Sequence, residues 1–476
     1  MSTESSRRAR ARRRRSRAFA SAFAIVIAVL AAVGMSGAAL TTAQGPRVTD
    51  VSVDPDAAVS AAGSRLIVTT TQSLADVDAS QVTITPAAEF TVDTSGRTVG
   101  IRFAQPLWDD TAYTVTITGL TGVGGGPQAD VTEDFRTPAL QTFVLQRGSG
   151  GDTIFSTDLT GTAGLPVFTD DHIEDFRATA SHLVVSTLDD DGHSHLVVTN
   201  LDGSDQRELP LPGDGTVTNL QSADRGSLIG YTFTDADVGA EGARESLLFT
   251  ASLTDAQRDA EPIAVERTGG ESRVDDWRFV PGTDSILMLT YDGALTLVSP
   301  SGGDPVALGN AISIDGIARG STTAVIERVD GPAAIDLATA QETALPATDA
   351  ELGQVNGVTP LADGQTLRVL AVVDGFTVSS TTVNVVDDAG GATPVFEVDP
   401  ADILIHTCVS PSGRYAAFTI APDAVSNAYD GYLLPMPERV QTHIVTLTDR
   451  AGDTPGAEVV ALSGFDISWC QTPPRG

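Results

Sequence analysis

A short signature recurs along most of this chain and constrains its fold more than any other feature. Each copy begins with an apolar residue, continues with polar residues such as aspartate or asparagine, and leads into a run typical of a β-strand. The copies start near residues 173, 217, 274, 314, 355, 405 and 467. A period of about 40–60 residues falls in the range of propeller repeats. Further apolar runs and polar turns follow the starts, so we expect one four-stranded antiparallel sheet, or blade, for each repeat.

The first and last repeats are incomplete in complementary ways. Residues 465–470 carry the start of a repeat without the strands that should follow it, whereas residues 142–168 carry strands without a start. We therefore expect residues 465–470 to lie beside residues 142–147 and to complete the first blade. The expected fold of residues 141–476 is all-β, a seven-bladed β-propeller closed by the C-terminal strand. Such closure removes the open sheet edge that otherwise promotes aggregation.

The only two cysteines, Cys408 and Cys470, occupy the same position in two copies of an I-x-x-C-x-x-P frame. In a closed ring these positions fall on the innermost strands of adjacent blades, the last and the first. The pattern therefore predicts a disulfide bond that joins the two ends of the ring. The alternative is a pair of buried, unbonded thiols. No C-x-x-C motif or histidine pairing accompanies the cysteines, so we expect neither a metal ion nor another cofactor.

The N-terminal segment has the composition of a membrane anchor. Residues 1–17 are rich in arginine, and the 23 residues 18–40 carry no charge. A helix of that length would span about 35 Å, enough for the apolar core of a bilayer. We expect a single-pass transmembrane signal-anchor at 18–40, with the basic stub 1–17 in the cytoplasm and the later domains outside the cell membrane. The alternative is signal cleavage near residue 43 and secretion. Thiols in either location tend to be oxidised.

Charge is distributed unevenly along the chain. The first 45 residues carry eight arginines and one glutamate, while the whole chain has a net charge of −33, so the remainder carries −40. A body this acidic repels phosphate backbones, which argues against nucleic acid as a partner. The chain contains arginine but no lysine, a composition typical of a high-GC, actinobacterial-type source.

Residues 46–138 alternate short strand-like runs with turn signals. About seven short strands in about 90 residues are typical of an immunoglobulin-like β-sandwich. The segments Pro46–Pro55, Pro106–Val115 and Glu133–Pro138 make this region resemble the bacterial Ig-like domains of envelope proteins. The resemblance implies a spacer or adhesion module.

Two stretches of the repeat region also resemble a known family. Val409–Phe418 is similar to the S-P-D-G strand-turn motif, and Leu196–Gly203 to the strand motif that ends in D-l-d-G, of the propeller repeats in the TolB family and in the non-catalytic domain of prolyl oligopeptidases. The resemblance implies a propeller fold and little about activity. No G-x-S-x-G motif occurs in the chain, so we expect no peptidase activity.

Several aspartates near the starts of the predicted innermost strands are candidate site residues. They are Asp175, Asp275, Asp276, Asp315 and Asp466. Together they could ring one mouth of the central channel and bind a cation or a basic partner peptide. The alternative is that each caps its own strand, with Arg177 and Arg278 as ion-pair partners. The segment Asp189–His195 combines carboxylates with imidazoles, but its Asp-Gly pair favours a hairpin turn over a metal site.

These observations favour a non-catalytic protein over an enzyme. We expect a membrane-anchored, extracytoplasmic binding or scaffold protein that presents its propeller to an envelope protein, peptide or glycan. Two alternatives remain open. One is a metal-dependent, lactonase-like hydrolase acting at the central channel, and the other is an envelope sensor that signals through the anchor. The sequence does not predict an oligomeric state.

Overall fold

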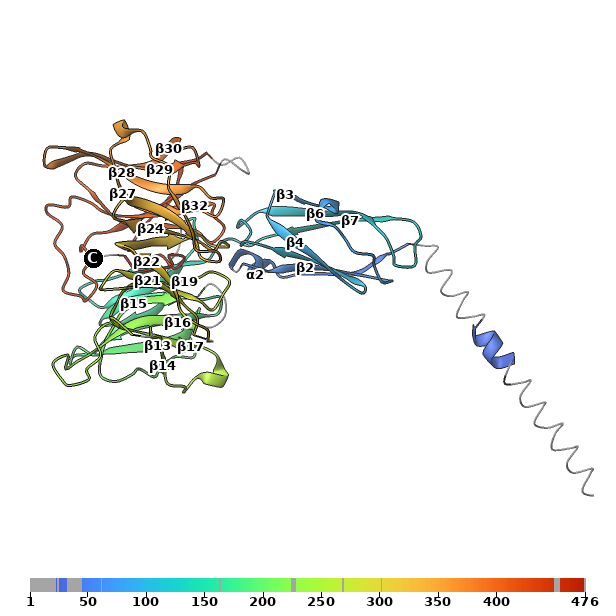
Figure 1. Cartoon of the computed structure of the whole chain (residues 1–476), viewed down its shortest axis with the longest axis horizontal. Helices are drawn as coiled ribbons and strands as arrows, with labels where there is room; N and C mark the ends of the chain where they lie inside the picture. The colour runs from blue at the N-terminus through green and yellow to red at the C-terminus, as the bar shows by residue number, and fades with distance from the viewer. Residues whose placement is uncertain are drawn as a thin grey trace, which may run out of the picture. The chain divides into compact units, whose positions relative to one another are not determined.

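The computed structural model describes residues 23, 25–31, 45–60, 62–161, 164–223, 228–267, 269–300, 302–448 and 454–474. The chain forms two compact units (Figure 1). The first consists of Met1–Asp54, Arg65–Arg102 and Tyr113–Phe135, and the second of Pro55–Ser64, Phe103–Ala112 and Arg136–Gly476. The predicted stub at 1–17 and most of the predicted anchor at 18–40 lie outside the described residues. Among the described residues, no helix has both the length and the apolar character needed to cross a membrane.

The first unit consists of two antiparallel sheets. One has the strand order β1-β2-β5-β4, and the other β3-β6-β7. Alternate residues of these strands are buried, as in β2, because successive side chains of a strand point to opposite faces of its sheet. The elements are β1 (Val48–Val53), β2 (Arg65–Thr70), η1 (Ala79–Gln81), β3 (Val82–Thr85), β4 (Phe90–Ser95), β5 (Thr98–Phe103), β6 (Ala112–Leu120) and β7 (Ala129–Arg136).

The second unit is a β-propeller built from successive antiparallel sheets, which we number as blades one to seven. Blade one contains β8 (Thr142–Gln146), β9 (Asp152–Thr157) and β10 (Leu165–Asp170); blade two contains β11 (Ile173–Ala178), β12 (His182–Leu188), β13 (Ser194–Asn200) and β14 (Arg207–Leu209). Blade three contains β15 (Gly215–Ser222), β16 (Leu228–Asp235), β17 (Leu247–Ser252), η2 (Asp255–Gln257) and β18 (Ile263–Ala264). Blade four contains β19 (Val274–Phe279), β20 (Ile286–Thr290), β21 (Ala294–Val298) and β22 (Val306–Asn310).

The remaining blades repeat the same order. Blade five contains β23 (Ser313–Ile317), β24 (Thr323–Arg328), β25 (Gly331–Asp336) and β26 (Gln341–Ala344). Blade six contains η3 (Ala350–Leu352), β27 (Gln354–Pro360), β28 (Thr366–Asp374), β29 (Thr377–Val386) and β30 (Ala392–Val398); blade seven contains β31 (Ile403–Val409), β32 (Tyr415–Ala421), β33 (Gln441–Thr446) and β34 (Glu458–Ser463). In blades two to seven the first strand is innermost, and these strands begin within a few residues of the predicted starts.

The recurring sequence signature marks a β-bulge in the innermost strands. The register with the next strand shifts before Asp175 in β11, before Asp276 in β19 and before Gly316 in β23. Equivalent shifts occur in β15, β27 and β31. A bulge sets two residues opposite one, bends the strand and re-aims a side chain. The polar residues of the signature therefore occupy the bend of each innermost strand.

One position near the end of the innermost strands joins neighbouring blades. Arg177 Nε donates to the carbonyl oxygen of Leu220 at 2.7 Å, and Arg278 Nη2 donates to that of Ile314 at 3.1 Å. Each acceptor lies on the innermost strand of the next blade. Cys408 occupies the same position in β31, and its link to the next element of the ring is covalent. This common role explains why a cysteine in this column lies within reach of the C-terminal segment.

The C-terminal segment lies beside β8, as predicted, but it does not form a continuous strand. Leu145 and Phe465 exchange two backbone hydrogen bonds of 3.0 Å, and the backbone N–H of Ser468 donates to Phe143 at 2.9 Å. The contact at Phe465 is an isolated bridge. Asp466 has a φ of 54°, and this left-handed conformation interrupts an extended backbone. The prediction of a closing strand is therefore corrected to a closing bridge followed by a turn.

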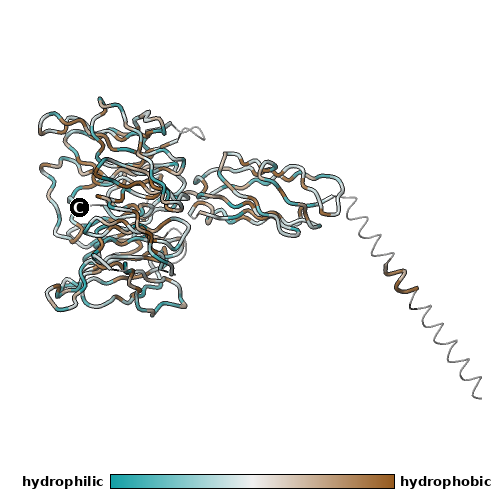
Figure 2. The backbone as a smooth tube through the Cα atoms, in the orientation of Figure 1, coloured by the Kyte–Doolittle hydropathy of each residue, from teal (hydrophilic) through white to brown (hydrophobic). Residues whose placement is uncertain are grey.

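The predicted disulfide is confirmed. Cys408 and Cys470 are bonded, and their Cα atoms are 5.4 Å apart, within the range that a disulfide requires. Apolar clusters fill the spaces between successive blades, for example between blades four and five around Leu289 and Ile326. Figure 2 shows hydrophobic stretches recurring along the strands of the blades. The core thus consists of layers between blades, which hold the blades to one another.

The propeller has two distinct ends, which we name by the direction of its innermost strands. The N-face is the end where these strands begin, and it also contains the hairpin turns between the second and third strands of each blade. The C-face is the opposite end. At the C-face, Arg414 Nη1 donates to the backbone and side-chain oxygens of Asp109 at 3.0 and 3.2 Å. Val59 of α2 (Pro55–Ser60) packs there in a buried cluster with Trp469.

Candidate functional site

Exposed large apolar side chains of the propeller gather at the N-face. Val329, Phe376 and Val425, each in a turn at this face, are at least 91% exposed. The other exposed N-face residues are Val238, Tyr291, Ile312, Val355, Val373, Val378, Ile403, Tyr429 and Leu433. Among the described residues of the propeller, the remaining exposed large apolar side chains lie on the outermost strands, at Leu165, Ile263, Val306 and Val459. Concentrated apolar surface is typical of an interaction site.

A groove of about 900 Å³ opens among these residues, between blades six and seven. Phe376 and Val378, from the β28–β29 hairpin, line one wall, and Ile403 of β31 and Val425 line the other. The C-terminal segment contributes Pro473 to the lining. The groove therefore leads from the apolar turns of the N-face toward the central channel.

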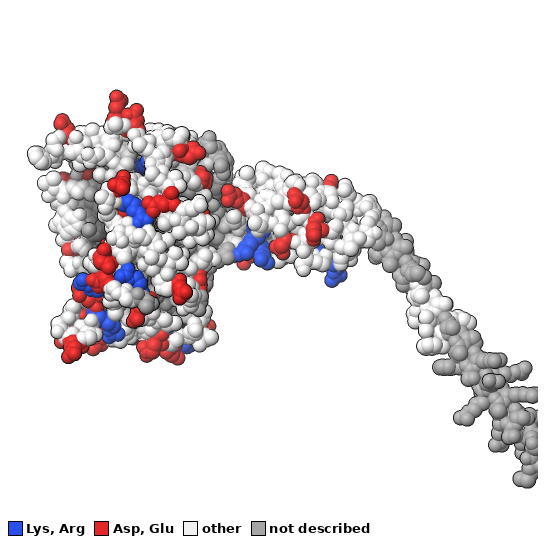
Figure 3. Space-filling view, viewed as in Figure 1, with Lys and Arg blue, Asp and Glu red and all other residues white. Residues whose placement is uncertain are grey.

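The rim of the groove is acidic. Asp399, Asp402 and Asp423 line it, and Asp315 lies on the side of the channel. Asp423 is 3.8 Å from Arg439, and both side chains are more than half exposed. Among the described residues, no ion pair involves Asp399 or Asp402. More widely, acidic side chains are spread over the visible surface of the blades, with fewer arginines among them (Figure 3).

A long loop from blade seven crosses onto blades one and two at the N-face. This seam loop comprises residues 422–440, between β32 and β33. Arg147 of blade one donates to Asp430 Oδ2 at 2.8 Å, and its guanidinium carbon lies 3.8 Å from the ring centre of Tyr432. The Tyr432 hydroxyl donates to Asp152 at 2.8 Å. The seam loop therefore forms a second link between the ends of the ring, at the N-face, whereas the disulfide lies toward the C-face.

Glu174, the bulge residue of blade two, receives the seam loop. Its carboxylate accepts hydrogen bonds from the backbone N–H groups of Leu433 and Leu434 at 3.0 and 3.1 Å. His172 Nε2 lies 2.7 Å from the same carboxylate, and the His172 ring packs at a tilt against Tyr432 with ring centres 4.0 Å apart. Glu174 is 2% exposed, so its carboxylate oxygens are hydrogen-bonded by these partners and not by water.

Two of the predicted carboxylates meet beside one arginine in the interior. Asp466 Oδ2 lies 2.6 Å and Asp175 Oδ1 3.0 Å from Arg177 Nη1, and all three side chains are buried. Asp175 Oδ1 also accepts from the backbone N–H of Phe176 at 2.8 Å. Burial raises the pKa of Asp175 well above its usual range, and the Asp466 carboxylate adds to this increase, while Arg177 opposes it. The group thus joins the first two blades through the contacts of Arg177 with the two carboxyl groups.

We predict that Asp175→Asn raises the urea midpoint of unfolding at pH 7. The folded protein holds the Asp175 proton more tightly than the unfolded chain, whose pKa is near the ordinary value of 3.8, so this group contributes more stability as pH falls through the folded-state pKa. The asparagine side chain resembles the protonated carboxyl group at every pH. The difference in urea midpoint between Asp175→Asn and the native chain should therefore shrink toward pH 4. Tryptophan fluorescence measures the midpoint, because all three tryptophans belong to the second unit.

Asp202→Asn is the matched control for this experiment. The exposed Asp202 accepts hydrogen bonds from Ser204, which lower its pKa. The Asp202 carboxylate therefore stabilises the folded protein at neutral pH, and this stabilisation is lost as pH falls. Asp202→Asn should lower the urea midpoint at pH 7, where Asp175→Asn raises it, and this deficit should shrink as pH falls. A lower midpoint for Asp175→Asn across the whole pH range would show that the ionised carboxylate is the stabilising form.

The other predicted carboxylates lie elsewhere. Asp276 pairs with Arg278 and accepts from the backbone N–H of Trp277 at 2.8 Å, which repeats the arrangement of Asp175 and Arg177. Asp275 is exposed, and Asp315 lines the channel side of the groove. Among the described residues, no three carboxylates bring oxygen atoms within 4.8 Å of one another. The predicted pairing of arginines with strand-start aspartates is thus present, whereas the five aspartates do not converge on one point.

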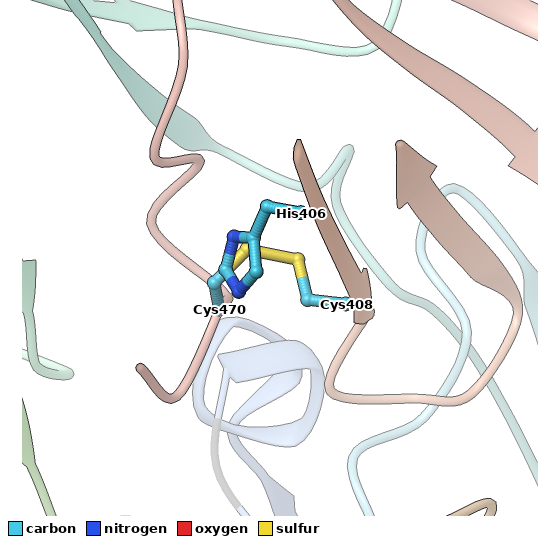
Figure 4. Close-up of side chains that lie close together, drawn as sticks. All are labelled: His406, Cys408 and Cys470. Carbon is cyan, nitrogen blue, oxygen red and sulfur yellow. A yellow bond between two sulfur atoms is a disulfide. The ribbon is translucent and has the colours of Figure 1, made fainter. Parts of the chain in front are cut away.

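A histidine lies beside the disulfide bond. His406 precedes Cys408 by two positions on β31, so both side chains lie on one face of the strand. Figure 4 shows the imidazole next to the two sulfur atoms, and the possible ligand atoms of the three residues lie within 4.8 Å of one another. Metal ligation by cysteine requires thiolates. In the oxidised protein the two sulfur atoms are bonded to each other, so neither can act as a thiolate ligand.

The predicted turn at Asp189–His195 is present between β12 and β13. Asp189 Oδ1 accepts from the backbone N–H groups of Asp191 and His193 at 3.0 and 2.8 Å. His195 lies between Glu208, at 2.6 Å, and Asp189, at 3.3 Å. The hydrogen bond that His195 donates to the Glu208 carboxylate raises the pKa of His195, and burial opposes this increase. These side chains hold the turn and pair with one another.

Sequence reasoning missed the apolar tips of the N-face. Phe376 and Val378 continue an alternating run that looks like an ordinary buried strand, and only the Asp374-Gly375 pair marks the turn. The partners of the seam loop could not be predicted from the sequence either. Arg147 and Asp430 are 283 positions apart, and no local pattern connects them.

Comparisons with known proteins show the fold alone. No family model matches the chain, and no curated protein matches it. The propeller fold resembles those of TolB from Acinetobacter baumannii (12% identity, 83% of this chain and 82% of that chain, TM-score 0.36) and of acylaminoacyl peptidase from Pyrococcus horikoshii (10%, 72% and 52%, 0.42). The tricorn protease is also similar (12%, 90% and 49%, 0.32). With identities and TM-scores this low, nothing about activity follows from them.

Proposed function

We propose that this protein is a non-catalytic binding or scaffold protein of the cell envelope. An N-terminal single-pass anchor holds an Ig-like spacer and a seven-bladed propeller outside the cell membrane, and the propeller presents its N-face to an envelope protein, peptide or glycan. The carrying observation is the one-sided distribution of exposed apolar side chains, with Val329, Phe376 and Val425 at the tips. A monomer gains nothing from exposed apolar turns, whereas a partner can bury them.

The two ends of the propeller support this assignment. At the C-face, residues of α2 and of 103–112 already contact the ring through Val59 and Asp109. At the N-face, the groove and the apolar tips remain open. In this proposal the disulfide and the seam loop hold the ring closed and make the N-face a rigid platform. A rigid surface loses little conformational freedom on binding, which favours affinity.

Site-specific photocrosslinking of the full-length chain in the cells that produce it tests this proposal. A photoreactive phenylalanine analogue is placed singly at Phe376, Val425 or Val329, and at Ile263 or Val306 as matched exposed positions on outermost strands. We expect crosslinked species of one defined mass from N-face positions and none from the outermost strands. Equal crosslinking from both sets, or none from the N-face, would contradict the proposal.

A further inference from the structure

The groove between blades six and seven has the chemistry of a peptide site. Its walls present apolar side chains, including Phe376, Val378 and Ile403. Its rim carries Asp399, Asp402 and Asp423, whereas its one arginine, Arg278, is only 6% exposed and is paired with Asp276. The accessible charge in the groove is therefore negative, and it complements a cationic ligand.

The backbone of the groove favours an extended chain over a sugar. Among the described strands, β27 pairs only with β28, and β31 pairs only with β32. The remaining edge of each strand faces the channel side of the groove. Open strand edges offer N–H and C=O groups at the spacing of another extended peptide, and pockets for alternate side chains supply specificity. The first residues of β27, Gln354 and Val355, are exposed.

We infer that this groove binds an extended protein segment in which apolar residues alternate with arginine or lysine. The inference rests on the proposed function, and it adds the site and the chemistry of the partner. Apolar side chains of the segment pack between Phe376 and Val425, and its basic side chains reach Asp399 and Asp402. Because Asp399 is exposed to solvent and Asp402 is half-buried, their attraction for basic side chains should weaken as salt screens it.

The test uses the full-length chain held in zwitterionic nanodiscs on a biosensor, with empty nanodiscs as reference. The probe is an eight-residue peptide that alternates valine with arginine or lysine. Its controls are the same peptide with glutamate in place of the basic residues, the same peptide with serine in place of valine, and chitotetraose as a glycan. We expect the basic apolar peptide to bind at least about tenfold more tightly than any control, because both the apolar contact and the charge are required.

Variants locate the binding within the groove. Phe376→Ser should weaken binding of the basic apolar peptide at least about fivefold, as for an anchor residue at the centre of an interface. The double variant Asp399→Asn and Asp402→Asn should weaken it about threefold at low salt and reduce its dependence on salt concentration. Ile263→Ser, at an exposed apolar position on an outermost strand outside the groove, should leave affinity within about twofold. Unchanged thermal unfolding of each variant shows that folding is intact.

The outcomes separate the inferred chemistry from the proposed function. Tighter binding of chitotetraose or of the acidic peptide, or equal effects of Phe376→Ser and Ile263→Ser, overturns the inferred peptide site. If this happens while Phe376 and Val425 still crosslink a partner in cells, the N-face remains the binding surface and only the chemistry was wrong. If the N-face crosslinks are also absent, both the inferred peptide site and the proposed function are wrong.

Discussion

Replacing both cysteines by alanine should lower the free energy of unfolding by about 4 kcal/mol relative to the oxidised protein. The bond joins residues that are 62 positions apart, and closing a loop of this length restricts the unfolded chain by about that amount. The variant tests a second consequence as well. Cys470 holds the segment that forms the bridge to Leu145, so its loss should loosen blade one before the other blades.

Urea unfolding followed by tryptophan fluorescence measures the effect, because Trp469 lies next to Cys470 and reports on the seam. The matched control is the native chain in excess dithiothreitol, which should unfold like the double alanine variant. The variant itself should not respond to the reductant. A difference below about 1 kcal/mol between oxidised and variant chains would show that the bridge and the seam loop close the ring without the covalent bond.

The repeat pattern predicted much of the fold because it reflects backbone geometry. The bulges of β11, β19 and β23 each place an acidic residue at the same point of the strand, so these strands share a signature that is visible in the sequence. Cys408 and Cys470 could be paired from the same alignment, because it places both in the column that contacts the next blade through Arg177 and Arg278. Local patterns of this kind survive in sequence even where the rest of the repeat has diverged.

The closing strand and the candidate site were less predictable, for physical reasons. The left-handed backbone at Asp466 cannot be read from a signature that elsewhere continues as a strand. Asp175 and Asp276 have the same sequence context, yet Asp175 meets a second carboxylate from Asp466 only because the ring closes beside it. Exposure of Phe376 likewise depends on how far its hairpin extends, and not on its neighbours in sequence.

Replacing Arg147 by methionine should destabilise the second unit by about 3–5 kcal/mol, the usual result of removing one partner from a buried ion pair. The Arg147 side chain is only 7% exposed, and it contacts Asp430, the ring of Tyr432 and the backbone of Glu174. Methionine fills a similar volume but leaves the Asp430 carboxylate in a largely dry site with one fewer donor. The urea midpoint from tryptophan fluorescence measures the loss.

Arg136→Met provides the matched control for this loss, because Arg136 pairs with Asp110 at 2.7 Å in a solvent-exposed setting, with 60% and 67% of the two side chains accessible. An ion pair of this kind contributes about 0–1 kcal/mol, so the control should unfold nearly like the native chain. Equal effects of Arg147→Met and Arg136→Met would mean that the seam loop contacts the ring without stabilising its closure.

A large effect of Arg147→Met alone, additional to that of losing the disulfide, would establish two independent links between the ends of the ring, one at each face. The N-face platform then depends on both, because the seam loop supplies Val425 and one wall of the groove.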